Sequence, residues 1–253
     1  MIEKKLDLLF RTAEMLLGSG ANSNRLERNL RRAAAIFGMD QHHLQFHFTL
    51  RTVMICYQED GRHYYRMHKV LHHGVNMQII SGLSRMIWKG FWEGFTLVDY
   101  ERELDRLSNL PKQYPRPVVI AGVALACAAF CKLLGGDFYA LAFTFLASSL
   151  ALFIRQELHH RHQNLYFTVL VSATVASGIA SLNALLPYSS TPNHAMMAAV
   201  LFLIPGVPLI NTVDDLIDGF TLMGTSRGMV AFLLLMSIAL GFLLVISTLN
   251  ISN

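Results

Sequence analysis

Five long apolar runs in the second part of the sequence constrain its fold more than any other feature. Each is close to the length of about 17 to 25 residues that an α-helix needs to cross the hydrocarbon core of a bilayer. Backbone groups in lipid must be satisfied internally, and continuous rather than alternating runs favour helices over a barrel. The expected spans are Pro117–Leu134, Phe138–Ile154, Leu165–Leu186, Ala195–Ile210 and Met229–Leu249.

Charge is concentrated before these runs. Residues 1–116 hold 17 of the 21 Lys and Arg residues and 12 of the 17 Asp and Glu residues, although the whole chain is 53% hydrophobic. The sequence therefore predicts one part in water and one in lipid. The expected division is a cytoplasmic domain at 1–113 and a transmembrane domain at 114–253. The basic residues alternate with acidic ones, which favours a surface beside anionic lipid over a nucleic-acid partner.

The charged part has the periodicities of a small α+β domain. Apolar residues recur at helical spacing, then alternate with period two, then return to helical spacing. The expected fold class is an antiparallel three-stranded sheet with helices, followed by an all-α membrane domain of about five transmembrane helices. The helices are expected at 2–17, 22–37, 75–92 and 97–107, the strands at 44–50, 52–57 and 63–67, with Asp60-Gly61 as a turn.

Basic residues near the span ends predict the orientation in the membrane, because cytoplasmic loops carry an excess of Lys and Arg. One side receives Lys112, Arg116, Arg155, Arg161 and Arg227, whereas Lys132 stands alone on the other. The N-terminus is therefore expected in the cytoplasm and the C-terminus outside. The uncharged loop 187–192 and the turn at Gly135-Gly136-Asp137 are expected on the outer face.

The fourth span carries the strongest sign of a functional site. Pro205 and Pro208 remove two backbone donors, and Gly206 permits unusual dihedral angles, so the helix is expected to break there, before Asn211. Freed carbonyl groups and a half-helix end inside a membrane are common materials of a solute or ion site. The alternative is an ordinary proline kink near the interface.

Three carboxylates follow this segment. Asp214 and Asp218 share a helical face, and Asp215 lies beside them, so the group can exchange protons or hold a cation; a solvated interfacial helix is the alternative. Asp137 is the one acidic residue in the outer half of the spans. It either lies in a functional re-entrant turn or caps the next helix.

Catalytic and metal-binding signatures are weak. His42-His43, His72-His73 and the group His159, His160 and His162 lack the usual ligand spacing, so no metal and no cofactor are expected. Ser19 lies between two glycines but lacks a nucleophile elbow, and no nucleotide-binding fingerprint is present. The sequence therefore does not predict an enzyme, and a hydrolase that uses Ser19 is the weakest alternative.

Several of these segments together resemble the threonine/serine exporter family. The resemblance rests on Leu17-Gly18-Ser19-Gly20-Ala21 with Arg25-x-Glu27, on Gly135-Gly136-Asp137, and on Pro205-Gly206-Val207-Pro208-Leu209-x-Asn211 followed by Asp215-Leu216 and Gly219. It runs through nearly the whole chain in order, and the proline-rich segment is its most specific part.

The resemblance implies a bacterial inner-membrane exporter of threonine, serine or dicarboxylates such as succinate. About ten helices are expected in fused members, so this chain is expected to be the larger subunit of a split system, in a hetero- or homo-oligomer with a short membrane protein. Secondary, proton-coupled export is the leading hypothesis, and a membrane-anchored sensory or interaction protein is the alternative. The expected solute or ion pathway comprises Pro205, Gly206, Pro208, Asn211, Asp214, Asp215, Asp218 and Asp137; Ser19, Arg25 and Glu27 are expected to gate it or to order the soluble domain.

Overall fold

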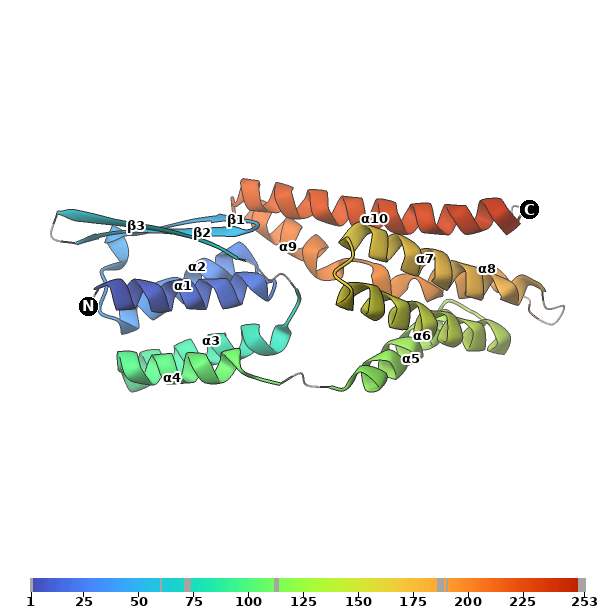
Figure 1. The fold of residues 1–253 in the computed structure, drawn as a ribbon, viewed down its shortest axis with the longest axis horizontal. Helices are drawn as coiled ribbons and strands as arrows, with labels where there is room; N and C mark the ends of the chain where they lie inside the picture. Colours follow the sequence, from blue (N-terminus) through green and yellow to red (C-terminus); the bar gives the residue numbers. More distant parts are fainter. Residues whose placement is uncertain are drawn as a thin grey trace. The chain divides into compact units, whose positions relative to one another are not determined.

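The computed structural model describes residues 2–59, 61–70, 74–111, 114–185, 189 and 191–249. Within them the chain is mostly helical, with one small sheet near the N-terminus (Figure 1). It forms two compact units, one of residues 1–111 with 206–229 and one of residues 112–205 with 230–253. The assignment of 1–113 to the cytoplasm and of 114–253 to the membrane stays a prediction. Asp60, His72, His73, Lys112 and loop residues Pro187, Tyr188 and Ser190 lie outside the described residues.

The first unit follows the predicted order of helices and strands closely. Its elements are α1 (Ile2–Gly18), α2 (Ser23–Ile36), η1 (Gln41–His43), β1 (Leu44–Thr49), β2 (Thr52–Glu59), β3 (Arg62–Lys69), α3 (Met77–Glu93), α4 (Leu97–Ser108) and α9 (Gly206–Ile217). The strands form an antiparallel sheet in the order β1-β2-β3. Phe48 pairs with Val53 and Leu44 with Tyr57, and all four side chains are buried on one face. Alternation along the strands therefore sets which face packs on the helices.

The core of this unit lies between helices α1 to α4 and the sheet. Leu9, Leu26, Leu83 and Tyr100 are fully buried in it. Met223, from the first turn of α10 (Thr221–Leu249), belongs to the same core at 1% exposure. The core of the first unit is thus completed by a residue that comes more than a hundred positions after the predicted end of the domain.

The second unit is built in the opposite way, with small residues inside. It contains α5 (Arg116–Leu133), α6 (Phe138–His160), α7 (Leu165–Ser181), η2 (Leu182–Leu185), α8 (Pro192–Ala199), η3 (Leu201–Leu203) and the rest of α10. Ala147, Ala176 and Ala198 are fully buried, whereas Leu133 and Phe138 are more than three-quarters exposed. Small buried residues let helices approach closely in lipid, and large apolar side chains on the outside suit a hydrocarbon solvent.

Within the described residues, four helices are long and apolar enough to cross a membrane, or five if a broken pair around residue 204 counts as one span. The expectation of about five spans agrees with this outline. Several boundaries differ from the prediction. The second span continues beyond Ile154 to His160. The third span ends in a 3₁₀ turn from Leu182, and the last helix begins at Thr221, eight residues early, because Thr221–Gly228 packs with the first unit.

A buried hydroxyl pair provides a test of the first unit. The Tyr100 hydroxyl lies 2.9 Å from Thr12 Oγ1, and burial raises the pKa of the phenol, so it remains protonated. Tyr100→Phe should lower the free energy of unfolding by about 1 kcal/mol, the usual worth of one buried hydrogen bond. Denaturant unfolding of the purified protein measures this. Tyr65→Phe, at a residue that is 67% exposed, should be neutral, and equal losses in both variants would contradict the assignment.

Candidate functional site

The predicted break in the fourth span is present and comprises Ile204 and Pro205. Ile204 leaves helical geometry with φ −60° and ψ 125°, and its N–H donates to Leu201 O rather than to a carbonyl four residues back. Pro205 has no N–H, and helix α9 begins directly after it at Gly206. Pro208 does not add a second break. It occupies the first turn of α9, where backbone N–H groups have no helical partner anyway.

Beyond the break, the polar face of α9 lies against the turn between α1 and α2. Asn211 Nδ2 donates to Gly20 O at 2.8 Å. Asp214 accepts from Asn22 Nδ2 at 3.2 Å, and Asp218 accepts from Asn24 Nδ2 at 2.8 Å. Two of the segments that carry the family resemblance are therefore in direct contact, although they are about 190 residues apart in the sequence.

Asp215 is the centre of this contact. Its carboxylate is fully buried and forms an ion pair with Arg227 at 2.7 Å, while its other oxygen accepts the N–H of Ser23 at 2.8 Å. Arg227, 6% exposed, also donates to Ala21 O at 2.7 Å. Both charges are thus satisfied, and one network ties α9, α10 and the α1–α2 turn together.

The turn itself depends on glycine and asparagine. Gly20 has φ +84°, in the left-handed region that favours glycine, and a Cβ there would lie 3.3 Å from Gly74 O. Asn22 Oδ1 accepts from Arg25 N and caps α2. Ser19 is only 5% exposed, so its hydroxyl is not available as a surface nucleophile. Glu27 pairs with Arg31 at 2.6 Å on the surface of α2.

Asp137 belongs to the other compact unit, apart from the α9 carboxylates. Its side chain caps α6 by accepting Ala140 N at 2.7 Å, and its second oxygen accepts from Ser189 Oγ at 2.9 Å. Its own N–H donates to Thr191 Oγ1. The geometry matches the helix-cap interpretation, which was the alternative to a functional re-entrant turn.

The sequence analysis did not identify the buried contacts of two arginines, Arg227 and Arg155. Arg227 and Arg155 were assigned only to the cytoplasmic excess of positive charge. Arg227 is the one charged residue of α10, and a lone ionisable group in an apolar helix signals a buried partner. Arg155 on α6 is partly buried, and its Nη1 donates to Phe202 O at 3.4 Å, just before the break. A carbonyl beside the interruption thus accepts a guanidinium N–H.

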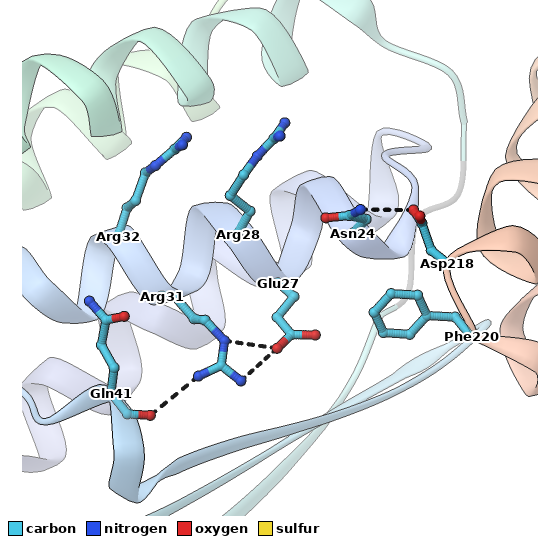
Figure 2. A pocket seen from close by; sticks show the side chains of 8 residues that line it. All are labelled: Asn24, Glu27, Arg28, Arg31, Arg32, Gln41, Asp218 and Phe220. Atoms are coloured by element: carbon cyan, nitrogen blue, oxygen red, sulfur yellow. Dashed lines mark hydrogen bonds and ion pairs between the residues drawn. The ribbon is translucent and has the colours of Figure 1, made fainter.

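The first unit also contains an open pocket of about 540 Å³ along α2. Figure 2 shows the Glu27–Arg31 pair on one side, with Arg31 also donating to Gln41 O, and Arg28 and Arg32 extending together on the other. The pocket is lined by Asn24, Glu27, Arg28, Arg31, Arg32, Gln41, Asp218 and Phe220. Among the described residues, no group of three or more His, Cys, Asp or Glu side chains is placed to hold a metal ion.

The buried ion pair predicts a strong coupling between two residues. Asp215→Ala or Arg227→Ala alone should lower the free energy of unfolding by about 3–5 kcal/mol, because each leaves a buried charge unpaired. The double variant should lose clearly less than the sum. Unfolding of the detergent-purified chain, followed by tryptophan fluorescence, gives all three values. Asp218→Ala, at an exposed carboxylate, is the control, and strictly additive losses would rule out the pairing.

Comparison with known proteins gives a consistent result. The family model described as "Putative threonine/serine exporter" matches residues 7–249. Proteins named "Probable succinate transporter subunit YjjP" from Klebsiella aerogenes and Escherichia coli are 33% and 32% identical, over 92% of this chain and 90% of each relative. A "Probable threonine/serine exporter" from Mycobacterium tuberculosis is 24% identical over 95% of this chain but only 45% of its own length. No solved structure matches.

Proposed function

Because the chain belongs to the threonine/serine exporter family, we propose that it is the larger subunit of a two-component secondary exporter in the bacterial inner membrane. The family and the relatives are transporters, so the chain is a membrane transport protein and not an enzyme. The more similar relatives, named as succinate transporter subunits, support a small dicarboxylate as the solute. Threonine and serine are second candidates, from relatives at lower identity.

The interrupted fourth span is the observation that best supports transport. A protein that only anchors a ligand-binding domain needs neither a broken apolar helix nor a partly buried arginine beside the break. Arg155 has several N–H donors, and one of them donates to Phe202 O. The remaining donors suit a solute carboxylate, since guanidinium groups bind carboxylates in a bidentate manner.

The carboxylates of α9 suit different tasks. Protonation of Asp215 would leave Arg227 buried without its counter-charge, so Asp215 is suited to hold α9 on the α1–α2 turn. Asp214 and Asp218 accept from the neutral amides of Asn22 and Asn24, and they can gain a proton without breaking an ion pair. We assign proton coupling to these two residues and docking to Asp215.

A partner subunit is supported by two observations. The relatives at about one-third identity are named as subunits. The side of α9 away from the turn exposes Ile210, Val213 and Ile217 at 63%, 55% and 78%. A short membrane protein or lipid would cover this apolar surface. Five spans would put the two termini on opposite sides of the membrane. We infer that the N-terminus lies in the cytoplasm, because cytoplasmic loops carry an excess of Lys and Arg, and that the C-terminus lies outside.

Succinate efflux tests the function directly. Cells that produce this chain together with a short membrane subunit of the family should lose preloaded succinate faster than cells that produce either protein alone. Threonine and serine, supplied as dipeptides, are measured in parallel. Efflux that does not change with this chain present at normal level would refute the proposal, and export of threonine alone would replace the dicarboxylate.

Arg155 provides a residue-level test of the solute position. Arg155→Gln should reduce efflux by at least about tenfold, because it removes a charge-assisted bond to the solute. Arg155→Lys should restore it only in part, since an ammonium lacks the guanidinium fork. Arg161→Gln, at an exposed arginine paired with Glu157 near the end of the same helix, is the matched control. Full efflux by Arg155→Gln at normal protein level would exclude Arg155 from the pathway.

Neutral variants test which carboxylates couple export to protons and which one holds α9 on the α1–α2 turn. Asp214→Asn and Asp218→Asn should leave the protein folded and weaken the dependence of efflux on the pH gradient, because neither amide can carry a proton across the cycle. Asp215→Asn and Asp215→Ala should instead lower the amount of folded protein. An unchanged pH-gradient dependence in the double Asp214→Asn, Asp218→Asn variant would remove both residues from the coupling step.

A further inference from the structure

The pocket along α2 contains two arginines without counter-charges. Among the described residues, neither Arg28 nor Arg32 has a carboxylate within 4.0 Å, whereas neighbouring Arg31 is paired with Glu27. Arg28 and Arg32 are four residues apart on one helix, where like charges repel each other. Figure 2 shows both side chains extending to the same side of α2. An anion placed between them would relieve this repulsion.

The environment of Arg32 holds its guanidinium in place. The guanidinium carbon lies 4.1 Å from the centroid of the Trp88 ring on α3, which is a close cation–π contact. Burial lowers the pKa of Arg32 from its ordinary value, and the nearby charge of Arg28 lowers it further. Arg32 is therefore a partly desolvated cation with its orientation already fixed, which reduces the entropy cost of binding an anion.

The formal charges of the lining define the ligand. The Glu27–Arg31 pair cancels, which leaves Arg28 and Arg32 against Asp218. The volume of about 540 Å³ is within the range of small-molecule sites. We propose that this pocket binds a small dianion, such as a dicarboxylate or inorganic phosphate, between Arg28 and Arg32. All of its lining residues belong to the first unit, so this site is distinct from the proposed solute position at Arg155.

Occupancy of the pocket is linked to α9 through Asp218. This carboxylate forms one wall and accepts from Asn24, whose position is one helical turn before Arg28. An anion in the pocket is repelled by Asp218, and coupling between two sites is reciprocal. Binding therefore loosens the last turn of α9 from α2. Asp218→Asn should in turn tighten anion binding several-fold, whereas a passive surface would show no change.

Tryptophan fluorescence gives a direct measurement. The chain has two tryptophans, Trp88 and Trp92, and Trp88 is the one stacked on Arg32. In the full-length Trp92→Phe protein, purified in detergent, titration with succinate or phosphate should change the Trp88 emission saturably. Arg28→Gln and Arg32→Gln should each weaken the apparent affinity by about tenfold or more. Arg51→Gln, at an exposed arginine outside the pocket, should leave it unchanged.

The same titrations can overturn the proposal. No saturable response to succinate or phosphate, or an undiminished response in the Arg28→Gln, Arg32→Gln double variant, would refute the site. Threonine binding as tightly as succinate would refute the dianion class. A response seen only when phosphatidylglycerol is added would assign the arginines to lipid headgroups instead. Because these assays measure binding without transport, a failed efflux experiment would leave this result standing, and the reverse also holds.

Discussion

A buried charge is stable in a protein only when an opposite charge and hydrogen bonds replace its water. Asp215 meets this requirement through two other segments, α10 and the α1–α2 turn. Arg227 neutralises it, Ser23 N–H satisfies its other oxygen, and Arg227 in turn binds Ala21 O. Arg227 lies near the start of α10, and Ser23 and Ala21 lie together at the α1–α2 turn. The network therefore fixes α9 relative to the core of the first unit, and the remaining α9 contacts are arranged around it.

The local structure could be predicted because it depends on neighbours in sequence. Period-two alternation from Leu44 and helical spacing from Ile2 gave the strands and helices within a few residues. Thr96 caps α4 in a full capping box with Asp99, an arrangement of two residues only three positions apart. The interruption before α9 was equally accessible, because a missing N–H at Pro205 is a property of one residue.

The partners of the site could not be predicted in the same way. Nothing near Asp215 in the sequence indicates that it meets Ser23, since that pairing depends on how the chain packs. Asp137 could be a cap or a ligand from its sequence context, and only the position of Ala140 N separates the two. Nothing near Arg28 and Arg32 in the sequence indicates that Trp88 and Asp218 lie around them. Long-range packing decides the partners of Asp215 and of the two arginines, whereas the role of Asp137 depends on the local geometry at the start of α6.

Met223 shows that the first compact unit is not continuous in sequence. It fills the same core as Leu26 and Tyr100, although it follows nearly the whole membrane bundle in the sequence. A fragment cut after Pro111 would lose this side chain together with the Asp215–Arg227 pair, and would expose the Gly20 and Ala21 carbonyls. The first unit is therefore completed only after residues 112–205 have been synthesised, so its last folding step awaits α9 and the start of α10.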